Sequence, residues 1–229
     1  MEPINLKKLN AARRERAAAV LVTEIVAGRD RVIREGDVVA GALGDEIAAA
    51  LRAGKSRMVA IDGVEFFLNV HLPPPRIVVI GAVHISQALA PIAKIAGYDL
   101  EIIDPRTAFA TPERFAGVIL HAEWPERVLA GRALDAYTAL VAVTHDPKID
   151  DFPIQAAFFA KCFYIGALGS RKTHAKRVER LMANGVGEVD IARIHAPIGL
   201  DIGASSPAEI AVATMAQIIS AFRNRRLGN

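Results

Sequence analysis

The sequence predicts an α/β protein in which a smaller N-terminal α+β domain precedes a C-terminal Rossmann-like domain with a doubly wound parallel sheet. Apolar segments of strand length alternate with helical segments from residue 77 to residue 222. Three consecutive prolines, Pro73 to Pro75, precede this alternation and cannot lie inside a helix or a central strand. Hydrophobic residues make up 52% of the 229 residues, which is enough for a packed core.

The prolines divide the chain into expected domains at residues 1–72 and 76–229. The first domain is expected to begin with a polar, alanine-rich helix. Its other expected elements are an apolar run at 20–26, a helix around 45–52 and short strands at 58–61 and 64–70. We recognise no chemical motif in this domain, so the candidate site residues come from the second one.

In the second domain, strands and helices are expected to take turns. The expected strands are residues 77–80, 100–103, 118–120, 139–143 and 162–165. The expected helices are residues 86–96, 127–134, 149–160, 173–182 and 208–222. This alternation predicts parallel strands with crossover helices on both faces. Ligands of such sheets bind outside the carboxyl ends of the strands, so the residues directly after each strand are the candidates.

A glycine loop after the strand at 162–165 is the strongest candidate. Gly166 and Gly169 allow the backbone to approach a ligand closely, and Ser170 is expected to cap the next helix. The amides at a helix N-terminus carry partial positive charge, and Arg171 and Lys172 add two full charges. The loop therefore predicts a site for a phosphate or another anion.

The loop after the first parallel strand has the position of a dinucleotide fingerprint but not its glycines. Gly81 is present, but Val83 and Ser86 stand where G-x-G-x-x-G requires the second and third glycine. We include Gly81 and His84 among the cofactor-binding candidates. Asp104, at the end of the second strand, would either reach a ribose hydroxyl or cap a turn. The alternative for the whole loop is a plain strand-to-helix turn.

Thr144, His145 and Asp146 follow the strand at 139–143. These side chains could coordinate a cation, orient a ligand amine or move a proton. The alternative for the acidic residues that follow, Asp150 and Asp151, is structural: an Asp-Pro turn and an aspartate N-cap for the helix at 149–160. We expect His145 and Asp146 to be functional.

A fourth loop presents Asp201 between Gly199 and Gly203. A carboxylate there could accept hydrogen bonds from the ring N–H and amino group of a pterin or guanine, so Gly199 and Asp201 join the candidates. The capping-box pattern of Ser206 and Glu209, by contrast, is explained by the start of a helix.

Composition excludes several classes of function. A net charge of +3 is too small to indicate nucleic-acid binding. The single cysteine excludes an internal disulfide framework and a multi-cysteine metal site, and Cys162 is expected to be a buried thiol. From this cysteine usage we expect a cytoplasmic protein without a metal site. No apolar stretch is long enough to span a membrane. Nucleophile-elbow, zinc-helix and tyrosine–lysine relay patterns are also missing, so we expect no catalytic residues.

The loops together resemble the XdhC/CoxI family. The resemblance rests on Thr144-His145-Asp146 and on the segments 164–171, 197–203 and 206–211, and it covers roughly residues 75 to 223. It implies an accessory protein of molybdenum hydroxylases such as xanthine dehydrogenase or carbon monoxide dehydrogenase. Such a protein binds molybdenum cofactor, protects it during sulfuration and helps to deliver it to the apo-enzyme. The sequence departs from the family pattern at Val83 and at Gly41-Ala42-Leu43, where many relatives have a cysteine.

The partners that we expect are a molybdenum hydroxylase apo-enzyme, a cysteine desulfurase and, in a homodimer, a second copy of the chain. On this interpretation the protein is a cofactor-binding chaperone more than an enzyme, although the sequence leaves that question open. The alternatives are an NAD(P)-binding oxidoreductase and a nucleotide-binding regulatory module, both of which would use the same sheet with NADP or another nucleotide.

Overall fold

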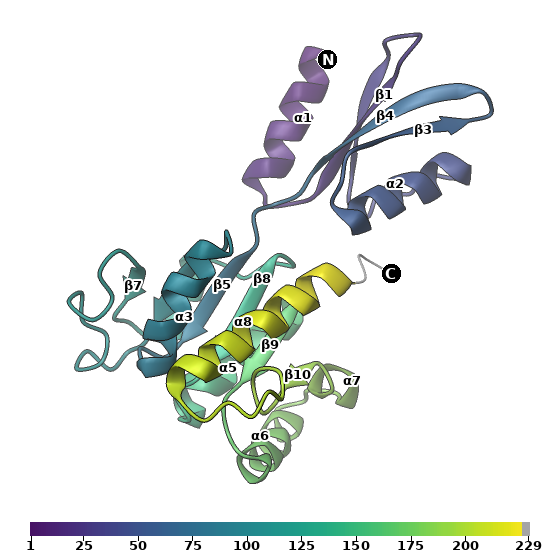
Figure 1. The fold of residues 1–229 in the computed structure, drawn as a ribbon. Helices are drawn as coiled ribbons and strands as arrows, with labels where there is room; N and C mark the ends of the chain where they lie inside the picture. Colours follow the sequence, from purple (N-terminus) through teal and green to yellow (C-terminus); the bar gives the residue numbers. More distant parts are fainter. Residues whose placement is uncertain (226–229) are drawn as a thin grey trace. The chain divides into compact units, whose positions relative to one another are not determined.

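The computed structural model describes residues 1–225 and divides into two compact units (Figure 1). One unit comprises Met1–Pro73 together with the C-terminal residues from Arg223, and the other comprises Pro74–Phe222. The last four residues of the predicted C-terminal domain, 226–229, lie outside the described part of the chain.

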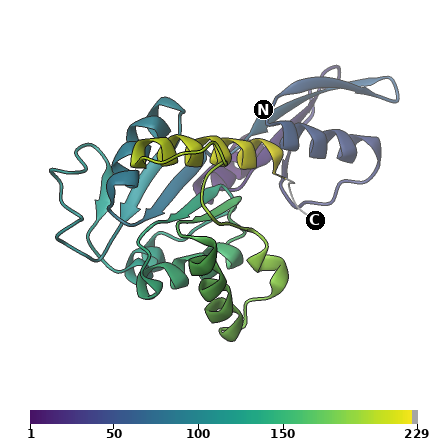
Figure 2. The same cartoon turned by 60° about the horizontal axis from the view of Figure 1, so that its bottom comes forward.

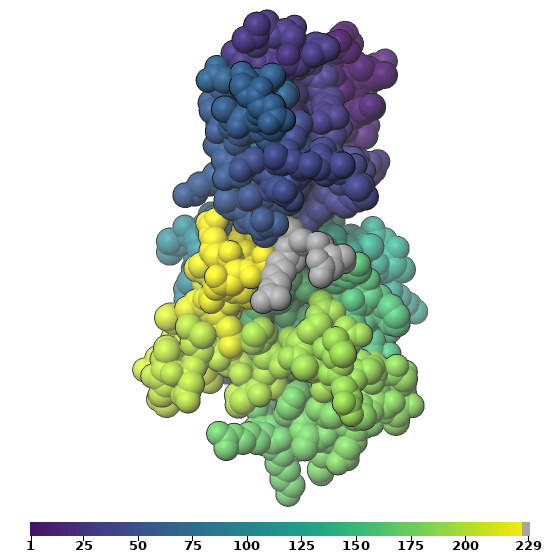
Figure 3. Space-filling view, turned by 90° about the vertical axis from the view of Figure 1, so that its right-hand side faces the viewer, coloured from purple at the N-terminus to yellow at the C-terminus, as the bar shows by residue number. Residues whose placement is uncertain are grey.

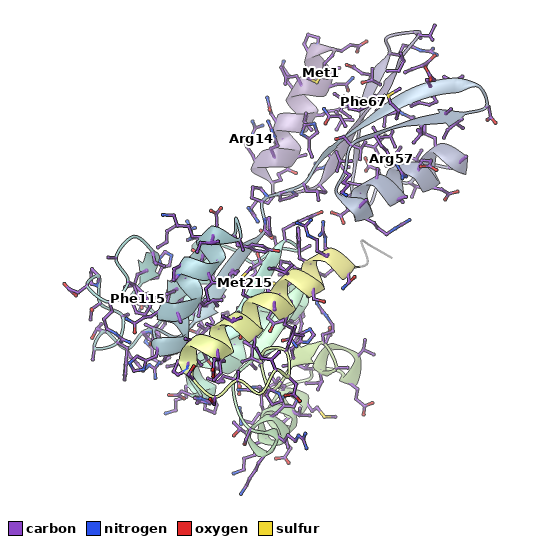
Figure 4. All side chains as sticks on the ribbon, viewed as in Figure 1. Met1, Arg14, Arg57, Phe67, Phe115 and Met215 are labelled. Carbon is purple, nitrogen blue, oxygen red and sulfur yellow. The ribbon has the colours of Figure 1, made fainter. Side chains whose placement is uncertain are left out.

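The first unit is an antiparallel sheet with two helices. Its elements are α1 (Pro3–Arg14), β1 (Ala19–Glu24), β2 (Asp30–Arg34), α2 (Gly41–Ala53), β3 (Arg57–Ile61) and β4 (Val64–His71). The strands run in the order β2-β1-β4-β3, and Val20 of the central β1 faces Val70 of β4. Arg57, labelled in Figure 4, is hydrogen-bonded and ion-paired with Glu46 and so ties β3 to α2. Because Gly41 starts this helix, the segment at 41–43 is the first turn of α2.

The second unit confirms the predicted Rossmann-like fold. Its strands are β5 (Arg76–Ile80), β6 (Asp99–Ile103), β7 (Ile119–His121), β8 (Thr138–Ala142), β9 (Tyr164–Ala167) and β10 (Ile194–His195). They form one parallel sheet in the order β10-β9-β8-β5-β6-β7. The helices are α3 (His84–Ile95), α4 (Pro125–Gly131), α5 (Pro147–Phe159), α6 (Arg171–Ala183), α7 (Glu188–Ile191) and α8 (Pro207–Asn224).

Helices cover both faces of this sheet, as Figure 2 shows. On one face α3 and α8 pack through a core that includes Leu89, Phe115 and Met215, the last two of which are labelled in Figure 4. On the other face α4, α5 and α6 pack through a core that includes Ile154 and Leu181. Alternate residues of β5 point to the two cores, which is the period of a strand buried on both sides.

The register places the candidate loops along one edge of the sheet. Ile80 is the partner of both Ile103 and Ala142, and Ala142 is the partner of Ala167. The carboxyl ends of β5, β6, β8 and β9 therefore lie in line. Chain order reverses between β5 and β8, so this part of the edge is the topological switch point, where ligands of such sheets bind.

Three short elements of the structure were not expected from the sequence. The strand β2 is only half-buried and polar, and α7 and β10 are each a single short segment. The strand expected at 162–165 begins instead at Tyr164. Among residues 1–225, no helix combines the length and the apolar character that crossing a bilayer requires.

Candidate functional site

The loop after β5 is held against the loop after β8. Gly81 has a φ of 123°, a conformation that favours glycine, and a Cβ atom there would lie 3.0 Å from the Thr144 methyl group. Val83 has extended backbone at the N-cap of α3, and its side chain packs against the core. His84 is exposed on the first turn of that helix. This loop is therefore a close-packed strand-to-helix turn.

Asp104 is fully buried and holds the loops after β5 and β6 together. Its carboxylate accepts a hydrogen bond from the Ala82 amide at 2.7 Å and two from the guanidinium of Arg106 at 2.7 and 2.9 Å. Burial alone would raise the pKa of Asp104, but these donors hold it below its usual value. The predicted contact of Asp104 with a ribose hydroxyl stays a prediction. The carboxylate already accepts a hydrogen bond from the Ala82 amide in the turn after β5.

The two carboxylates that follow β8, those of Asp146 and Asp150, have different roles in the structure. His145 adopts left-handed backbone with a φ of 64°, and Asp146 caps α5 by accepting a hydrogen bond from the Lys148 amide. The structural alternative of an Asp-Pro turn with an aspartate N-cap is thus found, with Asp146 as the cap and Asp150 and Asp151 inside the helix. Asp150 is instead buried within the first turns of α5, where its Oδ1 accepts a 2.7 Å hydrogen bond from the Thr144 hydroxyl.

The glycine loop leads into α6 as predicted. Ser170 caps α6 by accepting a hydrogen bond from the Thr173 amide at 3.2 Å. Gly169 has a φ of 140°, and a Cβ atom there would lie 3.1 Å from the Thr173 side chain. One turn further along, Arg177 turns inward and donates a hydrogen bond through Nη2 to the Leu168 carbonyl of the loop.

A pocket of about 340 Å³ lies between α5 and α6, at the carboxyl end of β8. It is lined by His145, Pro147, Asp150, Lys172, Thr173, Lys176, Arg177 and Arg180. The lining residues of α6 are spaced four apart along two adjacent rows, so one face of this helix supplies four cationic side chains. The region of the chain that includes α6 and α7 forms the green surface in Figure 3. The pocket volume lies at the lower end of the range for small-molecule sites, roughly 300–1,000 Å³.

Two residues of the inner wall have buried polar atoms without a hydrogen-bond partner within residues 1–225. These atoms are Nε and Nη1 of Arg177 and Oδ2 of Asp150. Only 2% of the Arg177 side chain and 1% of the Asp150 side chain is exposed. The two side chains form an ion pair in which Nη2 lies 4.0 Å from Oδ2, a distance too long for a hydrogen bond.

Burial shifts the proton affinities in this wall. It raises the pKa of Asp150 to about 6, although the Thr144 hydrogen bond and the Arg177 charge act in the opposite direction. Burial also lowers the pKa of His145, and the nearby Arg177 charge lowers it further. Buried polar groups normally have hydrogen-bond partners, so an ion pair with unused donors and an unused acceptor on a cavity wall indicates a place for a polar ligand.

Two of the predicted glycines serve packing. A Cβ atom at Gly166 would lie 2.7 Å from the Ile198 side chain, and one at Gly199 would lie 3.0 Å from Ala213. The Gly199 amide and the Tyr164 hydroxyl both donate hydrogen bonds to Gln217, at 2.9 and 2.7 Å. These contacts join the fourth loop to α8.

The structure thus separates the predicted site residues into groups. His145 and Lys172 line the pocket, and Thr144 contacts it through Asp150. Asp201 and Arg171 are exposed and do not line it. Sequence reasoning missed Arg177, although the spacing of positions 173, 177 and 181 puts it on the same helical face as the fully buried Leu181.

Cys162 is predicted to be unreactive in the folded protein. Its thiol is buried immediately before β9, and burial raises its pKa to about 12, so almost no thiolate is present at neutral pH. We expect maleimide labelling at least about 100-fold slower than for free cysteine under native conditions, and fast labelling in denaturant. Since the sequence has one cysteine, mass spectrometry assigns the label directly. Rapid native labelling would contradict the buried placement.

The second unit is similar to known proteins. The family model described as the XdhC Rossmann domain matches residues 77–218. The uncharacterized protein YqeB of Escherichia coli K12 is 33% identical over 160 residues, which cover 69% of this chain and 29% of YqeB. A probable xanthine dehydrogenase subunit from Bacillus subtilis 168 is 34% identical over 149 residues, 64% of this chain and 43% of the relative.

Two further proteins are similar. The molybdenum cofactor insertion chaperone PaoD of Escherichia coli K12 is 30% identical over 148 residues, 65% of this chain and 40% of PaoD. The chain therefore matches less than half the length of each of these curated relatives. A crystal structure of a xanthine dehydrogenase from Bacillus halodurans has a TM-score of 0.63 and 21% identity, covering 96% of this chain and 64% of that one. This last similarity concerns the fold.

Proposed function

The chain belongs to the XdhC family, and from this premise we propose that it is an accessory protein that binds molybdenum cofactor and helps its maturation and insertion into a molybdenum hydroxylase. The family resemblance predicted from the loop sequences is confirmed by the match at residues 77–218. Two relatives support the role through their names, a cofactor insertion chaperone and a probable subunit of xanthine dehydrogenase. The client is then an enzyme of the xanthine dehydrogenase or carbon monoxide dehydrogenase type.

The single observation that carries cofactor binding is the α5–α6 pocket, with the unpaired nitrogens of Arg177 and the unpaired oxygen of Asp150. The pterin part of the cofactor offers N–H donors and a carbonyl acceptor, and its side chain ends in a phosphate. The cations of α6 match the phosphate, and Asp150 matches a hydrogen-bond donor on the group that is bound there. These residues therefore fit the group, which would supply the molybdenum chemistry when bound in the client enzyme.

Partners and compartment follow from the same proposal. A protein that hands a sulfurated cofactor to an apo-enzyme has to meet that enzyme, and a cysteine desulfurase would be the source of the sulfur. We expect this transfer in the cytoplasm and in a homodimer. The chain's own contribution is binding and protection of the ligand.

Anaerobic purification tests the proposal. The protein is co-expressed with cofactor biosynthesis, purified without oxygen and assayed for molybdenum and for oxidised pterin. We expect both in near-stoichiometric amounts, and at least about a tenfold loss in the double variant Arg171→Glu/Lys172→Glu, because charge reversal repels a phosphate. The matched control is Lys94→Glu, an exposed charge reversal on α3, on the opposite face of the sheet. Absence of pterin and molybdenum from the native protein would refute cofactor binding.

A further inference from the structure

The ion-paired Arg177 and Asp150 in the α5–α6 pocket have unused hydrogen-bonding atoms of opposite kinds. Arg177 offers N–H donors through Nε and Nη1, whereas Asp150 offers an acceptor through Oδ2. A simple anion would satisfy Arg177 but would be repelled by the carboxylate. A ligand that fits both must carry negative charge and also a hydrogen-bond donor.

We propose that this pocket is a phosphate site in which the bound phosphate group and the Asp150 carboxylate share one proton. Arg177 donates to the phosphate from the buried wall, and Lys172 and Lys176 balance its charge from the same face of α6. Oδ2 of Asp150 accepts a hydrogen bond from a protonated phosphate oxygen. The identity of the molecule that carries the phosphate rests on the proposed function, but the phosphate site itself does not.

The surroundings of Asp150 allow it to discriminate between ligands that carry a proton and ligands that do not. Its Oδ1 is fixed by the hydrogen bond from Thr144, so Oδ2 is the oxygen left for a ligand. Since burial raises the pKa of Asp150 to only about 6, the group is mainly ionised at pH 7.5 and needs the proton of the ligand. The charged or titratable groups around it are Arg177 and Arg180 on α6, Asp151 on α5, His145 after β8 and Arg106 after β6.

Most of these neighbours are already engaged. Arg180 forms a two-point ion pair with Asp151, and Arg106 forms one with Asp104. Arg177 is different, because its one hydrogen bond to Leu168 leaves two nitrogens without a partner within residues 1–225. A buried guanidinium with unused donors is costly unless a ligand completes it, which makes Arg177 the centre of the site.

Comparing the affinities for phosphate and sulfate distinguishes a shared proton from a general attraction for anions. At about pH 7.5 both are mainly tetrahedral dianions, but only phosphate carries a proton that a carboxylate can accept. Isothermal titration of the full chain with each salt, at constant ionic strength, is expected to show at least about tenfold tighter binding of phosphate. Equal affinity for the two ions, or binding of neither, would overturn the proposal.

Two variants assign the discrimination to residues. In Asp150→Asn the side-chain oxygen still accepts from Thr144, while an amide donor replaces Oδ2. This donor should strengthen sulfate binding, so that phosphate and sulfate bind with about equal affinity. In Arg177→Met binding of both ions should be lost, with Lys176→Gln as a second variant if the first does not fold. Lys94→Glu is the control. An unchanged phosphate preference in Asp150→Asn would reject the shared proton.

The outcomes also distinguish this site from the cofactor function. If phosphate discrimination is observed but no pterin is retained during anaerobic purification, the site stands and the cofactor assignment fails. If pterin is retained by Arg177→Met as well as by the native protein, the cofactor function stands and the site is wrong.

Discussion

Replacing Gly199 by valine is expected to destabilise the second unit by about 3–5 kcal/mol, because a positive-φ strain and an overpacked contact add together. Gly199 has a φ of 92°, and a Cβ atom there would lie 3.0 Å from Ala213 and 3.1 Å from the Thr214 amide nitrogen. Moving the loop outward would break the hydrogen bonds from Gly199 to Gln217 and from Leu200 to Ala213. The fourth loop would then lose its attachment to α8.

Gly203→Ala is the matched control for this variant. Gly203 lies in the same loop with a φ of 73°, but no atom lies within 4 Å of the Cβ position, so only the backbone strain of about 1 kcal/mol is expected. Urea denaturation followed by circular dichroism gives both free energies of unfolding. Equal effects of the two substitutions would show that Gly199 is needed for its conformation alone. A negligible effect of Gly199→Val would contradict the close contact with α8.

The fold was predictable because its signals are local. Strands buried on both faces read as short apolar runs, such as Ile77 to Ile80, and some of the helices begin with recognisable caps. Ser170 and the pair Ser206 and Glu209 form the hydrogen bonds expected of such caps. The two-residue strand β10 exists through its pairing with β9, where Ile194 faces Ile165, and no local pattern encodes that contact.

The site was predictable only in part, because burial of charge is decided by tertiary packing. The sequence placed the anion site at the start of α6, yet the residue with unpaired donors is Arg177, in its second turn. One local signal was available for the neighbouring loop. Pro147 is favoured at the first position of a helix, which makes Asp146 the cap and leaves Asp150 inside the helix. The charge on Asp150 could then be expected to need a partner or a ligand.

Asp104→Ala is expected to cost about 3–5 kcal/mol of unfolding free energy, because it leaves a partly buried arginine and a backbone amide without their shared acceptor. The carboxylate links the Ala82 amide to Arg106, so its loss would loosen the first loop as well as the second. An exposed carboxylate on β6, the strand that Asp104 directly follows, supplies the control. Asp99→Ala, at the start of β6, should change stability by no more than about 0.5 kcal/mol.

The pH dependence of stability identifies the charge of Asp104 as the cause. Since its donors hold the pKa of Asp104 below the ordinary 3.8, its contribution is fully present above that value and is lost as the pH falls through the lower, folded-state pKa. Native protein should therefore lose stability more steeply in acid than Asp104→Asn does. If Asp104 instead served a dinucleotide ribose, Asp104→Asn would leave stability and its acid dependence unchanged and weaken NADPH binding in a fluorescence titration. That result would favour the oxidoreductase alternative. We do not expect it, because an acceptor already used by Ala82 and Arg106 has little capacity left for a ribose hydroxyl.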